Sequence, residues 1–244
     1  MVFARLQKSR GSSKWVQLCI NKLKHMTQHN TSPSEEKAVS VTLMLIDECG
    51  SMASLKKATE ESHLGILQHI QQECSTMPNL TQYVNTWTFT ERQVIEKQIL
   101  TKIENGDELQ SLVLRPNGST PLFDAIGKAC TQLENQLKHL KISSANTMVT
   151  VALFTDGFEN SSREFSLKET KRLIERLKGQ GWSFNYYGSD QSVEEMSEKL
   201  SFDHSMKMEY SEEGFQEGMQ CYAAKSSSDK MEYLKKWGIN FSKN

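Results

Sequence analysis

The chain has 244 residues, of which 37 % are hydrophobic and 24 % charged, values ordinary for a soluble globular protein. This length suits one α/β domain with an extension at one or both ends, and a domain of this size buries a large core without disulfides or a structural metal. The formal net charge of -1 excludes a strong overall attraction to nucleic acid or to an anionic membrane.

The five cysteines occur singly, at positions 19, 49, 74, 130 and 221. An odd number without a CxxC pair argues against a disulfide framework or a Cys-based zinc site, and it favours a reducing compartment. No apolar run reaches the length of a membrane span, and the N-terminus lacks the apolar core of a secretory signal. We therefore expect a cytoplasmic protein.

The first 40 residues form a basic arm, in which no acidic residue precedes Glu35. Apolar side chains recur at helical spacing within residues 14–28, which predicts an amphipathic helix followed by a polar linker that contains Pro33. We expect this helix to pack on its own chain or on a partner. Contact of residues 1–24 with nucleic acid, or a role of the arm as a mitochondrial presequence, stays open.

The first half of the main segment predicts a strand, a helix and a hairpin. Residues 41–46 are continuously apolar, as in a strand buried on both faces. A helix is expected over 53–74, and residues 81–100 predict a hairpin with its turn near Glu91–Arg92. A strong helix is expected over 121–140, starting at Pro121 behind a capping Thr120.

The second half continues the alternation of strands and helices. Residues 147–154 predict a second buried strand, and Ser166 with Glu169 forms a capping-box pattern at the start of a helix over 166–178. The remaining elements are expected at 182–187 (strand), 192–200 (helix), 205–210 (weak strand), 212–223 (helix) and 229–237 (a further helix).

This alternation predicts an α/β fold: an open, mostly parallel, doubly wound (Rossmann-like) sheet with one antiparallel edge hairpin and helices on both faces. The expected organisation is an arm over 1–40, a main domain over 41–225 and a C-terminal tail or helix over 226–244.

Ligands of an open parallel sheet bind outside the carboxyl ends of its strands. The two buried strands end on Asp47 and Asp156, Ser51 follows the first, and Thr120 precedes a long helix on the same side. Two carboxylates near several hydroxyls repel each other unless a cation lies between them. Oxygen ligands with room for water suit Mg²⁺, or Mn²⁺, and leave a position open for an outside carboxylate.

These residues resemble the von Willebrand factor type A (VWA) family over about residues 40–210. The sequence around them is most similar to that of bacterial and phage-type intracellular members of the family. The family's DxSxS motif corresponds to residues 47–51 here, its later Thr to Thr120 and its later Asp to Asp156. The resemblance implies a metal-ion-dependent adhesion site, in which a metal held by the protein binds an acidic residue of a partner protein.

One position departs from the family pattern: Cys49 stands where the motif has its first metal-binding Ser. A thiol is a poor ligand for Mg²⁺, and a thiolate prefers softer metals. The site would therefore bind Mg²⁺ weakly, favour manganese or zinc, or bind no metal at all.

The predicted function is a non-enzymatic, metal-dependent protein-binding module with Asp47, Cys49, Ser51, Thr120 and Asp156 as the metal-site residues. A metal-free scaffold is one alternative, and a magnesium-dependent phosphotransferase or phosphatase is another.

Simpler roles remain for several of these residues. Asp47 and Asp156 could each cap a helix, and so could Thr120. Glu48 is expected to point away as a loop charge. Residues 159 and 160 are expected either at the rim of the site or as ordinary surface residues.

Overall fold

Six strands form one sheet in the order β3-β2-β1-β4-β5-β6 in a computed structural model that describes residues 38–189 and 193–238. The expected arm helix over 14–28 lies outside these residues. The strands are β1 (Ala38–Asp47), β2 (Leu80–Thr90), β3 (Gln93–Ile103), β4 (Thr147–Thr155), β5 (Trp182–Gly188) and β6 (His204–Lys207).

All neighbouring strands are parallel except the β2–β3 hairpin at one edge, whose turn is at residues 91 and 92. This confirms the expected α/β sheet with one antiparallel edge. After β1 the chain forms β2 and β3 on one side of β1, and it then forms β4, β5 and β6 on the other side. The strand order therefore reverses between β1 and β4, where an open sheet of this kind forms its binding crevice.

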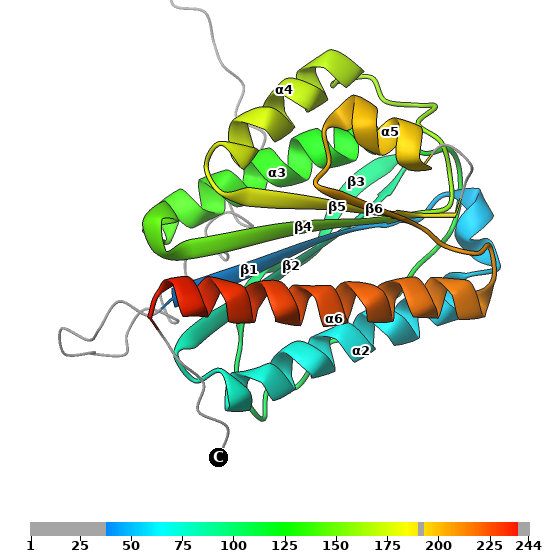
Figure 1. The fold of residues 1–244 in the computed structure, drawn as a ribbon. Helices are drawn as coiled ribbons and strands as arrows, with labels where there is room; N and C mark the ends of the chain where they lie inside the picture. Colours follow the sequence, from blue (N-terminus) through cyan, green and yellow to red (C-terminus); the bar gives the residue numbers. More distant parts are fainter. Residues whose placement is uncertain (1–37, 190–192, 239–244) are drawn as a thin grey trace, which may run out of the picture. The chain divides into compact units, whose positions relative to one another are not determined.

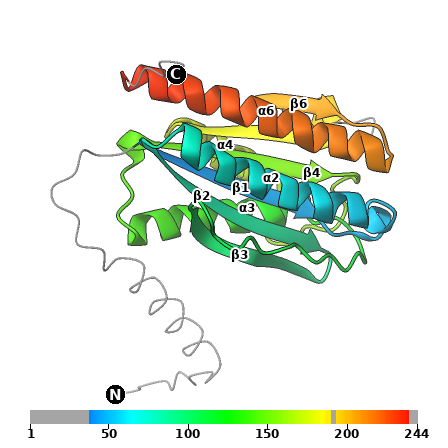
Figure 2. The same ribbon diagram turned by 90° about the horizontal axis from the view of Figure 1, so that it is seen from below.

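Helices cover both faces of the sheet (Figure 1). In Figures 1 and 2, α2 (Lys56–Thr76) and α6 (Glu212–Lys236) lie side by side on one face. The opposite face carries α3 (Leu122–His139), α4 (Leu167–Lys178) and α5 (Val193–Leu200). Two short 3-10 helices, η1 (Gly50–Ala53) and η2 (Ser144–Asn146), precede α2 and β4.

The alternation of side chains along β1 explains the two layers. Val41, Leu43 and Leu45 join the apolar cluster under α3, α4 and α5. Met44 and Ile46 point the other way, into the cluster under α2 and α6. A strand buried on both faces has no polar side, which is why the sequence of β1 reads as one apolar run.

One of the two expected helix caps is present. The Ser166 hydroxyl accepts the Glu169 N–H and the Glu169 carboxylate accepts the Ser166 N–H, which completes the capping box of α4. The expected cap of α3 by Thr120 was wrong, because the helix begins at Leu122 with Pro121 in the cap position and no side-chain cap bond. Glu159 instead accepts the N–H of Phe123 in the first turn.

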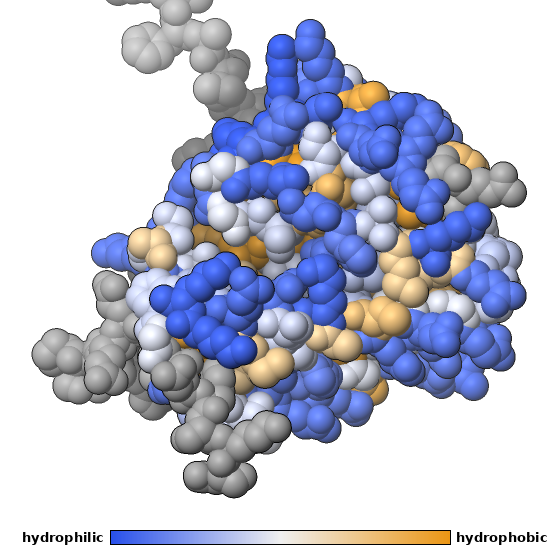
Figure 3. Space-filling model, in the orientation of Figure 1, coloured by the Kyte–Doolittle hydropathy of each residue, from blue (hydrophilic) through white to orange (hydrophobic). Residues whose placement is uncertain are grey.

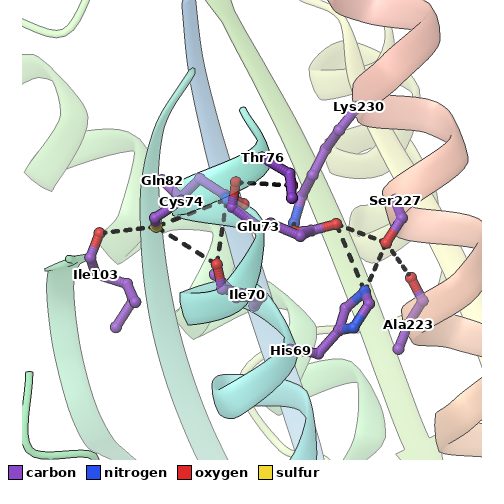
Figure 4. A network of polar contacts seen from close by, with 10 residues as sticks. All are labelled: His69, Ile70, Glu73, Cys74, Thr76, Gln82, Ile103, Ala223, Ser227 and Lys230. Carbon is purple, nitrogen blue, oxygen red and sulfur yellow. Dashed lines mark hydrogen bonds and ion pairs between the residues drawn. The ribbon is translucent and has the colours of Figure 1, made fainter. Parts of the chain in front are cut away.

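The two expected C-terminal helices are one continuous helix, α6. The expected boundary between residues 225 and 226 falls inside it. Ser227 is compatible with the helix interior because its hydroxyl donates to the carbonyl of Ala223 at 3.0 Å and to Glu73 of α2 at 2.5 Å. One turn on, Lys230 pairs with Glu73 at 2.6 Å, so polar side chains join α6 to α2 (Figure 4).

Hydrophilic side chains cover most of the face seen in Figure 3, and apolar atoms show only in small areas between them. Within the described residues, no helix is both long and apolar enough to cross a membrane.

Candidate metal centre

The expected site residues meet at the carboxyl ends of β1 and β4, which are neighbours in the sheet. Asp47 is the last residue of β1, and Asp156 directly follows β4. Asp47, Cys49 and Asp156 each offer a ligand atom, and these three atoms lie within 4.8 Å of one another. The topology thus brings together residues more than a hundred positions apart in the sequence.

Hydrogen bonds fix the members of this cluster. The two carboxylate oxygens of Asp47 accept the N–H of Cys49 at 2.8 Å and the hydroxyl of Thr155 at 2.6 Å. The Ser51 hydroxyl donates to Oδ1 of Asp156 at 2.8 Å. The Cys49 sulfur lies 3.0 Å from the Ser51 hydroxyl and 3.5 Å from Oδ1 of Asp156.

The loop that carries Thr120 is held against the loop after β1 by two backbone hydrogen bonds. The N–H of Gly50 donates to the carbonyl of Gly118, and the N–H of Asn117 donates to the carbonyl of Glu48, each at 3.0 Å. The left-handed conformation of Gly118, with φ of 68°, favours glycine. This pairing places Thr120 beside the cluster, so all five expected site residues are brought together.

Gly157 marks how closely the site is packed. A Cβ atom at this position would lie 2.9 Å from the Thr120 hydroxyl, 3.7 Å from the carboxylate of Asp47 and 3.8 Å from the sulfur of Cys49. The absence of a side chain therefore lets the chain after β4 pass directly over the cluster.

Burial dominates the electrostatics of the site. It raises the pKa of Asp47 to about 7, although hydrogen bonds from Thr155 and Cys49 oppose this shift. It also raises the pKa of the Cys49 thiol to about 12, with the charge of Asp47 acting in the same direction. Asp156 further raises both values by charge repulsion. A cation between these groups would favour their charged forms and remove this repulsion.

Sequence reasoning misplaced Glu48. Instead of pointing away as a loop charge, its side chain is fully buried. Its carboxylate accepts the Thr88 hydroxyl at 2.7 Å and the N–H of Arg115, and it lies 3.4 Å from Nζ of Lys97. The alternation of β1 does not extend past Asp47, so the sequence carried no signal for this orientation.

Thr155 was missed as a member of the site. Its hydroxyl holds Asp47 across the β1–β4 pair, and its position immediately before Asp156 at the end of a buried strand was the available signal.

Of residues 159 and 160, only Asn160 bonds directly to a predicted site residue. The side-chain oxygen of Asn160 accepts the N–H of Thr120 at 2.8 Å, and the backbone N–H of Asn160 donates to the Thr120 carbonyl at 3.1 Å. Glu159 accepts the N–H groups of Ser161 and Ser162, at 2.9 and 2.8 Å. Asn160 therefore positions Thr120, while Glu159 organises the loop before α4.

The donor atoms suit a divalent cation. Two oxygens bound side by side on an octahedral Mg²⁺ at 2.0–2.1 Å lie about 2.9 Å apart, close to the 2.8 Å between the Ser51 hydroxyl and Asp156. The two buried carboxylates supply the negative charge that such an ion needs.

No family model matches the sequence, and neither does any curated protein. Solved structures do match in fold. The pilus adhesin SpaC from Lactobacillus rhamnosus GG superposes with a TM-score of 0.53 at 13 % identity, over 79 % of this chain and 31 % of SpaC. The vWF domain of the type V pili tip protein Mfa5 from Porphyromonas gingivalis gives 0.51 at 7 % identity, over 86 % of this chain and 99 % of that domain.

Proximal thread matrix protein 1 from the mussel byssus gives a TM-score of 0.50 at 15 % identity, over 78 % of this chain and 48 % of that protein. This chain therefore spans less than half of the matrix protein and of SpaC. Together with the sheet order, these likenesses show that the chain has the fold of a VWA domain. The class of protein is thus a VWA-like α/β domain with a mixed carboxylate, hydroxyl and thiol cluster at the carboxyl end of its sheet.

Proposed function

We propose that this chain is a non-enzymatic, cytoplasmic protein-binding module. Asp47, Ser51, Thr120 and Asp156, with Cys49 beside them, hold a divalent cation such as Mg²⁺ or Mn²⁺, and the cation binds an acidic residue of a partner protein. The observation that carries this proposal is the convergence of three ligand atoms within 4.8 Å at the reversal point of a VWA-like sheet.

Two further observations support the proposal. Among the solved structures of the same fold are a pilus adhesin and a pili tip protein. Cys49, Cys74, Cys130 and Cys221 are all free thiols, which fits a reducing compartment such as the cytoplasm.

The location of Asp47 argues against the phosphotransferase alternative. A carboxylate that takes up a phosphoryl group needs access to its substrate. Asp47 is fully buried, and its two oxygens already accept hydrogen bonds from Cys49 and Thr155.

Calorimetric titration of the full chain with Mg²⁺ and with Mn²⁺ tests the metal site. We expect one ion per chain, lost in Asp47→Asn and in Asp156→Asn, which keep the side-chain shape and remove the charge. Asp229→Asn is the matched control, because Asp229 pairs with Lys225 within α6 and does not belong to the cluster. Absence of binding of every divalent cation tested, Zn²⁺ included, would contradict the proposal.

The partner step has its own test. Once a partner is identified, its binding should disappear with EDTA and in Asp47→Ala, Ser51→Ala or Thr120→Ala. Binding that persists under all these treatments would support a metal-free scaffold instead. The internal hydrogen bonds of Asp47 favour that second candidate, because they satisfy its oxygens without any ion.

A further inference from the structure

We infer that the sulfur of Cys49 is a direct metal ligand, and that the site selects a thiophilic ion of the zinc class over Mg²⁺. This inference rests on the proposed function, because it identifies the ion held by the same cluster.

The first argument is the position of the sulfur. Cys49 is buried within the loop after β1, and its ligand atom belongs to the same 4.8 Å cluster as the carboxylates of Asp47 and Asp156. The sulfur is 3.5 Å from Oδ1 of Asp156. A tetrahedral Zn²⁺ with Zn–S of about 2.3 Å and Zn–O of about 2.0 Å separates two such ligand atoms by about 3.5 Å.

The second argument is the number and type of ligands. Two carboxylates and one thiolate give three protein ligands, and a tetrahedral ion then keeps one position for an outside group, as open zinc sites do. Mg²⁺ prefers an octahedral shell of oxygen, into which a sulfur fits poorly. The lack of a CxxC pair excludes a closed Cys-rich zinc site but not this mixed, open one.

Binding requires the thiolate form of Cys49. The sulfur–hydrogen bond breaks, the proton leaves to solvent, and the electron pair forms the sulfur–metal bond, so the oxidation states of the metal and the sulfur are unchanged. Cys74, by contrast, donates to the backbone carbonyls of Ile70 and Ile103 and lies outside the cluster.

Absorption spectroscopy with Co²⁺, a visible stand-in for Zn²⁺, tests the inference on the full chain. A thiolate bound to Co²⁺ gives a charge-transfer band in the near ultraviolet that oxygen ligands do not give. We expect this band in the native chain and in Cys221→Ser, whose exposed thiol lies on α6, and its loss in Cys49→Ser.

Calorimetry with Zn²⁺ and Mg²⁺ on the same variants measures the selectivity of the site between these two ions. In Cys49→Ser the affinity for Zn²⁺ should fall by at least about tenfold. Loss of a residue that only hydrogen-bonds to a metal ligand already lowers metal affinity by about tenfold or more, and Cys49 is proposed as a ligand itself. The affinity for Mg²⁺ should be retained or increase, which also shows that this variant folds.

The outcomes separate this inference from the proposed function. Binding of Mg²⁺ or Co²⁺ that depends on Asp47 but gives no charge-transfer band would overturn the thiolate ligand and leave the proposed function standing. Failure of Co²⁺, Zn²⁺ and Mg²⁺ alike to bind the native chain would overturn both. A band that survives in Cys49→Ser would assign the sulfur to another cysteine and overturn the inference.

Discussion

His63 is a buried titratable residue of α2 that does not belong to the candidate metal centre. Its Nε2 lies 3.1 Å from the Thr86 hydroxyl, while no hydrogen-bond partner is found for Nδ1 among the described residues. Burial lowers the pKa of His63 from 6.5 to about 4. The folded protein therefore keeps this side chain neutral where the unfolded chain would bind a proton.

We predict an acid-sensitive stability from this shift. Below pH 6.5 the unfolded chain binds a proton that the folded protein does not take up until about pH 4. The free energy of unfolding is therefore highest above pH 6.5, and it falls by up to about 3 kcal/mol as the pH drops toward 4. Urea denaturation across this range measures the loss.

His63→Gln should reduce the pH dependence of the free energy of unfolding, because glutamine does not titrate. His139→Gln, at an exposed position at the end of α3, should leave it unchanged. An equal pH dependence in all three proteins would show that His63 does not cause it.

The site residues show what could be foreseen at this scale. Asp47, Ser51, Thr120 and Asp156 were identified because the ends of buried strands and a loop pattern mark them in the sequence. Glu48 was not, because its direction depends on the hydroxyl of Thr88 and the backbone of Arg115, partners that only the folded loops bring to it.

At the scale of elements, a buried ion pair lies in the contact of α2 with α6. Glu73 and Lys230 are 5 % and 1 % exposed, and the Glu73 carboxylate also accepts the Ser227 hydroxyl and lies near His69 (Figure 4). A buried charge that loses its partner is much less stable than one in water.

Lys230→Met should lower the free energy of unfolding by about 3–5 kcal/mol, because Glu73 then stays buried without its cation. Lys225→Met is the control, since Lys225 and Asp229 form a half-exposed pair on the same helix that contributes about 0–1 kcal/mol. Denaturation midpoints measure both. If the two variants lose equal stability, the buried pair is not what holds α6 to α2.

The double variant Glu73→Leu with Lys230→Met separates lost pairing from lost packing. It should recover much of the stability, because apolar residues of similar volume often replace a buried ion pair without loss.

The elements were predicted best where local signals and burial agree. The run of apolar residues in β1 and the capping box of α4 each specify a structure within a few positions. Residues 226–228 misled the prediction, because three consecutive serines suggest a break. In the fold, the Ser227 hydroxyl bonds to Glu73 of another helix, and this contact cannot be deduced from the local sequence.

At the scale of the whole molecule, an ion that binds only the folded protein stabilises it. At a concentration about 100 times its dissociation constant, the ion adds about 2.7 kcal/mol to the free energy of unfolding. For a domain of this size we expect the melting temperature to rise by about 5–10 °C. Thermal melts with and without Mg²⁺, Mn²⁺ or Zn²⁺ measure the shift.

Asp156→Asn should abolish this shift, and Asp229→Asn should retain it. A melting temperature that does not respond to any of the three ions in the native chain would speak for the metal-free scaffold.

The central place of β1 has a mechanical consequence. This strand pairs along its length with β2 on one side and with β4 on the other, in parallel register. A force that pulled β1 along its length at Asp47, resisted by β2 and β4, would load both rows of hydrogen bonds in shear rather than open them one by one. The loop at the candidate metal centre is therefore anchored to the strand best placed to carry a tensile force.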